Sequence, residues 1–117
     1  MGETGVRSEL LACLEACEEC VHECQHCAAE CIKHGGDAAA GALLCLDCAD
    51  ACAAAMNALA RESDHHGDFC ALAAHLCELC VSHCEKEADK HPHCARCADA
   101  CRKCAAECRK HAAEKHT

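Results

Sequence analysis

Cysteine and alanine, rather than large aliphatic residues, occupy most apolar positions of this chain, and they recur with a helical spacing. Cysteines in the first quarter of the sequence follow one another at steps of four and three residues, and the last quarter repeats these steps. Such steps place side chains on one face of an α-helix, so each series predicts a helix with a single stripe of thiols. Alanine, leucine, glutamate, lysine and arginine fill the other positions and favour helix.

Three breaks in the pattern divide the chain into four segments. The predicted helices cover residues of about 5–33, 38–61, 65–89 and 92–115. At the first break, Gly35 and Gly36 suit a left-handed backbone. The candidate caps or first-turn residues of the second, third and fourth helices are Asp37, Ser63 or Asp64, and Pro92. Short connections make successive helices antiparallel, so the sequence predicts an all-α, up-down-up-down four-helix bundle, with residues 1–117 as a single domain.

All 18 cysteines lie on the predicted stripes and none falls in a break. They are Cys13, Cys17, Cys20, Cys24, Cys27 and Cys31 in the first helix, Cys45, Cys48 and Cys52 in the second, Cys70, Cys77, Cys80 and Cys84 in the third, and Cys94, Cys97, Cys101, Cys104 and Cys108 in the fourth. These positions form the seam that leucine occupies in an ordinary bundle. The sequence therefore predicts a bundle whose interior is lined by sulfur.

Composition and charge narrow the class of function. The chain has one aromatic residue, Phe69, and a formal net charge of −9 with its histidines neutral. An acidic chain with a single aromatic side chain disfavours nucleic acid and anionic membranes as partners. No stretch approaches the roughly 18 apolar residues of a membrane span, and no secretory signal is recognisable. We therefore expect a cytoplasmic location, where thiols stay reduced.

Thiols in this number and arrangement indicate a soft metal ion rather than catalysis or cross-linking. Neighbouring cysteines on one helix face project in parallel and do not suit the torsion that a disulfide needs. Disulfides across the bundle are possible, but the expected cytosolic location opposes them. An oxidoreductase would set one or two cysteines in distinct surroundings, and iron–sulfur clusters favour cysteines in loops. No catalytic array is recognisable, so no enzyme activity is expected. A thiol redox sink is the alternative from another functional class.

Charge favours multiple Cu(I) ions over zinc. An all-thiolate zinc site carries a formal charge of −2, and several such sites in one core would bury uncompensated charge. About one Cu(I) per thiolate leaves the interior near neutral, and Cu(I) selects thiolate ligands that can bridge between ions. A zinc or mixed soft-metal buffer is the alternative within metal binding.

Continuing each stripe past its last cysteine reaches the ends of the bundle. His111 is the candidate non-cysteine ligand. For Met56, His66 and His34, both metal binding and a packing role are consistent with the sequence. One end, predicted to be the entry and exit port, gathers Cys13, Met56, His66, Cys70, Cys108 and His111. His34 lies at the opposite end. The other histidines are expected on the surface or behind the ligands: His22, His26, His65, His75, His83, His91, His93 and His116.

Two segments, CEECVHECQHCAAEC at residues 17–31 and HCARCADACRKCAAEC at residues 93–108, resemble the cytosolic branch of the bacterial copper storage proteins. The resemblance covers essentially the whole chain. It implies a four-helix bundle that takes up many Cu(I) ions on thiolates for copper storage and detoxification, and it implies a homo-tetramer. The chain departs from the family pattern in its second helix, with three cysteines, and near Ala73 and Ala74, where we expect fewer metal sites.

Overall fold

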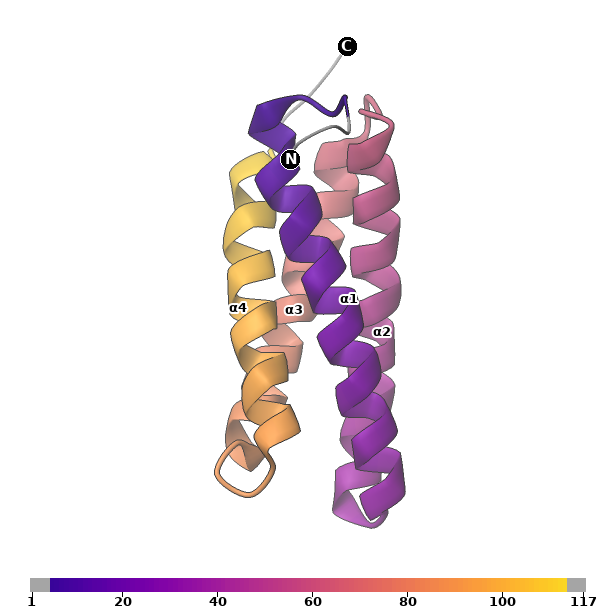
Figure 1. Ribbon diagram of the computed structural model, residues 1–117, viewed down its shortest axis with the longest axis vertical. Coiled ribbons are helices and arrows are strands. Elements are labelled where there is room, and N and C mark those ends of the chain that lie inside the picture. The colour runs from indigo at the N-terminus through magenta and orange to yellow at the C-terminus, as the bar shows by residue number, and fades with distance from the viewer. Residues whose placement is uncertain (1–4, 114–117) are drawn as a thin grey trace.

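The computed structural model describes residues 5–113, apart from the side chain of Asp37. Four helices occupy this range: α1 (Ser8–His34), α2 (Asp37–Ala60), α3 (His66–Glu87) and α4 (Pro92–His111). They run alternately in opposite directions, side by side, as a four-helix bundle (Figure 1). The all-α four-helix architecture predicted from the sequence is confirmed. The helices are slightly shorter than predicted, since α1 begins at Ser8 and α3 ends at Glu87.

Two hairpins make up the bundle. One hairpin is α1–α2 and the other is α3–α4. The two helices within each hairpin contact each other more extensively than the hairpins do. The hairpins meet through α1 with α4 and through α2 with α3. The α1–α2 and α3–α4 connections lie at the same end, where the two hairpins diverge (Figure 1). The α2–α3 connection lies at the other end. Side chains that extend the stripes are thereby sorted into two distinct ends of the core.

The connection between α1 and α2 consists of two glycines in a backbone conformation that other residues avoid. Gly35 has φ 70° and Gly36 has φ 57°, so the prediction of a left-handed backbone is confirmed. Gly36 is also the residue that immediately precedes α2, which begins at Asp37 itself. The predicted cap at Asp37 is therefore wrong, because the tight reversal leaves that position inside the first turn.

Ser63, a predicted cap of the third helix, instead helps to close the end of α2. The Ser63 N–H donates to the Ala58 carbonyl at 2.9 Å, and the Glu62 N–H donates to the Leu59 carbonyl at 3.1 Å. With Glu62 at φ 51°, this is a Schellman motif that closes α2. His65 precedes α3, so neither predicted cap holds that position. Pro92 at the first position of α4 is confirmed.

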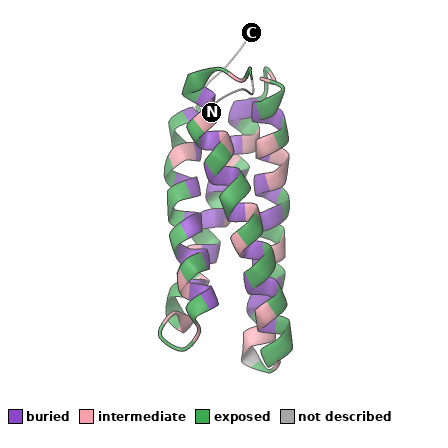
Figure 2. Cartoon of the chain, viewed as in Figure 1, coloured by how far each residue is buried: buried purple, intermediate pink, exposed green. Residues whose placement is uncertain are grey.

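The thiol stripes face inward on all four helices, because every cysteine on them is buried. Figure 2 shows buried segments recurring at intervals along the helices. Every cysteine is buried, with at most 3% of its surface exposed. Small alanines beside them, such as Ala28 and Ala49, let neighbouring helices approach closely. Leu10 and Leu59 are the largest fully buried side chains, and both lie at the α2–α3 end. The core is therefore built from sulfur and methyl groups.

The apolar character of α2 is high enough to meet the length and hydropathy criteria for a membrane span. An 18-residue window within Ala38–Ala60 has a mean hydropathy of 1.5, and 44% of that window is buried inside the bundle. Alanine and cysteine supply most of this hydropathy. The expectation that no stretch approaches a membrane span is therefore wrong for α2 by composition, although its cysteines lie in the protein core.

Candidate metal centre

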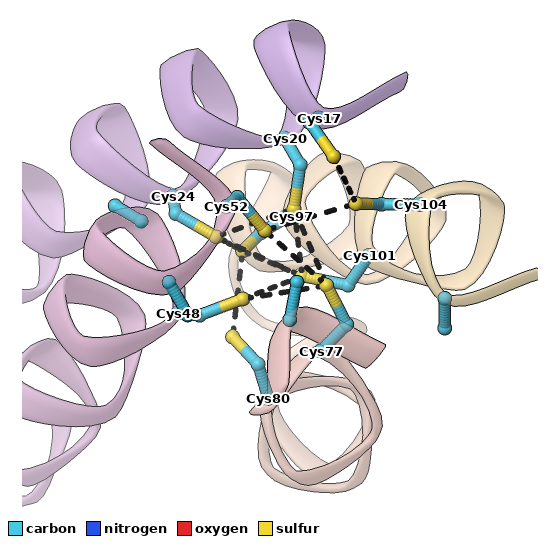
Figure 3. Close-up of a cluster of buried hydrophobic side chains, with 14 of the residues drawn as sticks. Cys17, Cys20, Cys24, Cys48, Cys52, Cys77, Cys80, Cys97, Cys101 and Cys104 are labelled. Atoms are coloured by element: carbon cyan, nitrogen blue, oxygen red, sulfur yellow. Dashed lines mark hydrogen bonds between the residues drawn. The ribbon is translucent and has the colours of Figure 1, made fainter. Parts of the chain in front are cut away.

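The sulfur atoms of four helices meet along the axis of the bundle. Figure 3 shows thiols from α1, α2, α3 and α4 pointing toward one another. Their Sγ atoms lie at short, non-bonded separations, such as 3.5 Å between Cys52 and Cys77 and 4.0 Å between Cys27 and Cys31. All 18 cysteines are free thiols. These separations far exceed the ~2.05 Å of a disulfide, so the interior is a set of reduced sulfurs in van der Waals contact.

The thiols form overlapping groups of four rather than separate sites. In each group the ligand atoms all lie within 4.8 Å of one another. The all-cysteine groups include Cys20–Cys48–Cys77–Cys101, Cys20–Cys52–Cys77–Cys104, Cys24–Cys80–Cys97–Cys101 and Cys27–Cys45–Cys84–Cys97. Several cysteines belong to two groups. An ion in one group therefore shares sulfur ligands with the next, which is the arrangement expected of a cluster.

The separations already suit a metal ion. Thiolates ~2.3 Å from a metal, the usual Zn–S distance, are ~3.8 Å apart in a tetrahedral site and ~4.0 Å apart in a trigonal one. The contact between Cys48 and Cys77 is 3.6 Å, and that between Cys80 and Cys97 is 3.8 Å. Little movement of the helices is needed to admit ions of this size. Distances alone therefore fit either coordination number, and the choice of metal depends on charge.

Burial holds the outermost thiols in their neutral form. It raises the pKa of Cys94 to about 12 and that of Cys31 to about 11, because the thiolate loses its hydration. Cys27 is an exception, since a hydrogen bond with the Cys45 thiol lowers its pKa to about 6, and His93 acts in the same direction. Since the metal ligand is the thiolate, ions that enter here must displace protons.

At the α2–α3 end, the structure gathers the residues that the sequence assigned to a port. The Cys13 and Cys108 sulfurs are 3.7 Å apart, and the rings of His66 and His111 meet edge to face with centroids 6.0 Å apart. Nδ1 of His66 also lies 3.0 Å from the Ser63 carbonyl oxygen. Leu10, Leu59 and His66 are at most 1% exposed, so apolar side chains and a histidine cover this end. His111 is buried too, and Met56 packs at the edge of the core.

The opposite end contains a histidine that sequence analysis placed on the surface or behind the ligands. His93 is only 5% exposed. Its Nδ1 atom lies 3.4 Å from the Cys27 sulfur, and it forms a four-ligand group with Cys27, Cys31 and Cys94. A surface position for His93 is therefore wrong. The signal was available, because His93 precedes Cys97 by four residues, a step that continues the stripe of α4.

Comparisons with known proteins agree with this interior. A sequence profile described as copper storage protein matches residues 6–113. The chain belongs to the copper storage protein family. No curated protein sequence matches it, but several solved structures of this family do.

Three structures illustrate the similarity to the copper storage protein family. Apo copper storage protein 3 from Bacillus subtilis is 41% identical, with a TM-score of 0.80 over 88% of this chain and 98% of that one. The Cu(I)-bound copper storage protein BsCsp3 is 38% identical, with a TM-score of 0.84 over 91% and 100%. A cytosolic copper storage protein from Streptomyces lividans with five coppers is 29% identical, with a TM-score of 0.81 over 91% and 93%.

The remaining histidines lie either on the surface or at the end of the bundle where the hairpins diverge. His22, His65 and His75 are exposed, as expected. His83 is half-buried and lies over Gly41 of α2, where a Cβ atom would come within 2.1 Å of its Nε2. His34 lies beside His91 and His93 at the end where the hairpins diverge. His116 lies outside the described residues.

Proposed function

We propose that this copper storage family member holds many Cu(I) ions on its 18 cysteines, with His111 as a further ligand at the α2–α3 end. The single observation that carries the proposal is the series of overlapping four-thiol groups along the bundle axis. A protein built for one tuned site needs one such group. A continuous series provides capacity, which is the requirement of storage and detoxification.

The preference for Cu(I) over zinc rests on the absence of counter-charge in the core. Among the described residues, no lysine or arginine is buried, and the buried polar side chains are three histidines. Thiolates in this core must therefore be neutralised by the ions they bind. One Cu(I) per thiolate achieves this, whereas tetrahedral zinc sites leave net negative charge in a medium where it is costly.

The proposal also covers where the protein acts, how many copies assemble and whether it catalyses a reaction. Residues 1–117 act as one domain in the cytosol, a proposal supported by the similarity to a cytosolic copper storage protein from Streptomyces lividans. The protein stores ions without catalysis. Exposed apolar side chains, Leu43 at 70%, Ile32 at 59% and Leu72 at 51%, support assembly into a homo-oligomer, for which the family resemblance suggests four copies.

Anaerobic titration tests the storage function. Reduced protein receives Cu(I) in competition with a chromophoric Cu(I) chelator, and the expected endpoint is about 15–20 ions per chain. Zinc titrated in the same way should saturate at no more than about four or five ions, because each takes four thiolates. An endpoint below about four Cu(I) ions per chain contradicts storage. A parallel assay adds a thiol oxidant to the reduced apo protein; rapid formation of disulfides, together with a low Cu(I) endpoint for the reduced protein, favours the redox alternative.

A further inference from the structure

Two buried histidines lie at the α2–α3 end of the core, His66 at the start of α3 and His111 at the end of α4. They are 1% and 7% exposed. His66 precedes Cys70 by four residues, and His111 follows Cys108 by three. Such steps put the members of each pair on one side of a helix. Two nitrogen and two sulfur ligands from neighbouring helices, here called the His–Cys group, thus face the same end.

The side chains of the His–Cys group lie close together. The ring centroids of His66 and His111 are 6.0 Å apart. Two imidazoles on one zinc ion, with Zn–N distances of ~2.0–2.1 Å, have centroids roughly 5–6 Å apart. The Cys108 thiol lowers the pKa of Cys70, whereas the Cys13 thiol and burial raise it to about 12. Cys70 and Cys108 therefore interact directly, next to the two rings.

His66 is held in the tautomer that a metal ligand needs. Its Nδ1 atom lies 3.0 Å from the Ser63 carbonyl oxygen. A carbonyl only accepts hydrogen bonds, so Nδ1 carries the hydrogen and, in the neutral ring, Nε2 carries the lone pair. Histidines that bind metals almost always donate their other ring N–H in this way, to a carbonyl or a carboxylate. The Schellman motif that closes α2 therefore orients His66 as a ligand through Nε2.

The ligand types of the His–Cys group favour zinc. Tetrahedral sites of two thiolates and two imidazoles are typical of structural Zn²⁺. In the connection before α3, Glu62 pairs with Arg7 at 2.7 Å and Asp64 is exposed. A hard cation such as Ca²⁺ needs several oxygen ligands, and the His–Cys group offers none.

Charge also distinguishes the His–Cys group from the all-thiol groups in the centre. Zinc on four thiolates carries a formal charge of −2, which disfavours it there. In the His–Cys group two thiolates balance Zn²⁺ and the imidazoles are neutral, so the occupied site has no net charge. One Cu(I) on the same four ligands would leave a charge of −1. Leu10 and Leu59, at most 1% exposed, cover this end, so a residual charge would be costly.

We propose that the His–Cys group binds one Zn²⁺ in the protein that has not yet taken up copper. The ion displaces one proton from each of the two thiols, and both protons pass to solvent. The α3–α4 connection lies at the other end of the bundle, so zinc joins these helices where the chain does not (Figure 1). This zinc site goes beyond Cu(I) storage. At full copper loading the softer Cu(I) replaces zinc on the thiolates and on His111.

A zinc titration without copper tests the site. Reduced, metal-free protein receives Zn²⁺ under anaerobic conditions in competition with a chromophoric zinc chelator. The first ion should bind about tenfold more tightly than the following ones, or better. His66→Gln and His111→Gln should each weaken this first step about tenfold or more and leave the later steps unchanged. His75→Gln, at an exposed histidine of α3, is the matched control and should bind zinc as the wild type does.

Co²⁺ gives a spectroscopic readout of the ligands themselves. It occupies the same tetrahedral sites as zinc, and its visible absorption bands lie at shorter wavelengths with two nitrogens and two sulfurs than with four sulfurs. The first equivalent added to the wild-type protein should show the mixed spectrum. In either histidine variant, the first equivalent should show the spectrum of an all-sulfur site.

Two results would overturn the zinc site. An all-sulfur spectrum for the first Co²⁺ in the wild-type protein would show that the central groups bind first. Unchanged zinc affinity in both histidine variants would show that the imidazoles are not ligands. If the variants fail to fold, the wild-type Co²⁺ spectrum decides alone. Failure of copper storage appears separately, as a low endpoint in the Cu(I) titration, which contains no zinc.

Discussion

The sulfur atoms of Cys52 on α2 and Cys77 on α3 lie 3.5 Å apart, where two four-thiol groups overlap. Cys77 belongs to both groups, and so does Cys20 of α1. Sulfurs shared in this way hold several ions together, so the loss of one sulfur affects more than one ion. Cys77 is therefore a sensitive position at which to test whether the interior acts as a cluster.

Cys77→Ala should lower Cu(I) capacity by about one to three ions per chain, because the sulfur it removes serves two neighbouring groups. Helicity should not change, since the neighbouring positions Ala73 and Ala74 already hold alanine in the same core. Chelator titration measures capacity, and far-ultraviolet circular dichroism measures helicity. Ser82→Ala, at an exposed position of α3, is the control. Unchanged capacity in Cys77→Ala would mean that the thiols bind ions independently of these groups.

The metal-free, reduced protein should be helical, because its core is made of buried alanine and cysteine and its helices are rich in strong helix formers. This distinguishes it from small domains that fold only with their metal. Copper should raise the melting temperature by roughly 15 °C or more, since ligand at ~1,000 times its dissociation constant adds ~4 kcal/mol to stability. Circular dichroism with and without copper measures both quantities. A random-coil spectrum of the reduced apo protein would contradict the prediction.

How far the sequence predicted this structure depends on how regular each part is. Steps of three and four residues between cysteines define one helix face, so the inward orientation of all 18 thiols followed from periodicity alone. The ends of the helices are less regular. Glu62 adopts a left-handed conformation that usually needs glycine, so nothing in the local residue types announced the Schellman motif.

At the two ends of the core, periodicity also predicted only part of the structure. His111 continues the α4 stripe by a step of three, so its buried position at the end of the core followed from the pattern, while its role as a ligand stays a prediction. His93 lies on the same face because it is four residues before Cys97. It also directly precedes Cys94, and the expected position was the surface or behind the ligands. A stripe of steps three and four has two possible neighbours at each end. Only the packing of α4 against α1 decides that His93 reaches the Cys27 sulfur.

Buried thiols should make the apo bundle less stable in alkaline solution. Burial raises the pKa of Cys31 from 9.0 to about 11 and that of Cys94 to about 12. Below pH 9 the folded and unfolded chains both keep these protons, so this contribution to stability is complete. Between pH 9 and about 11–12 the unfolded thiols ionise while the folded ones stay protonated, and the free energy of unfolding falls.

Chemical denaturation of reduced apo protein at pH 7 to 11 measures this loss, which should be on the order of 2–3 kcal/mol for Cys31. The double variant Cys31→Ala/Cys94→Ala should lose less stability over the same range. It retains all the lysines, so it also corrects for ion pairs that weaken at high pH. A free energy of unfolding that stays constant or rises from pH 9 to 11 would show that these thiols ionise as readily in the fold as in the unfolded chain.

Gly41 of α2 lies against the imidazole of His83. A Cβ atom at residue 41 would lie 2.1 Å from Nε2 and 2.7 Å from Cδ2 of this imidazole, closer than atoms approach in proteins. Gly41→Ala must therefore push the half-buried ring outward. Alanine favours helix over glycine by ~1 kcal/mol, and displacement of the ring should cancel part of that gain.

The double-mutant cycle of Gly41→Ala and His83→Ala separates these effects. We expect Gly41→Ala to stabilise the His83→Ala variant by up to about 1 kcal/mol and to stabilise the wild-type bundle by less. Chemical denaturation of the four apo proteins gives the coupling energy. Equal effects of Gly41→Ala in both backgrounds would show that the ring turns away at no cost, and that glycine at this position has no packing role.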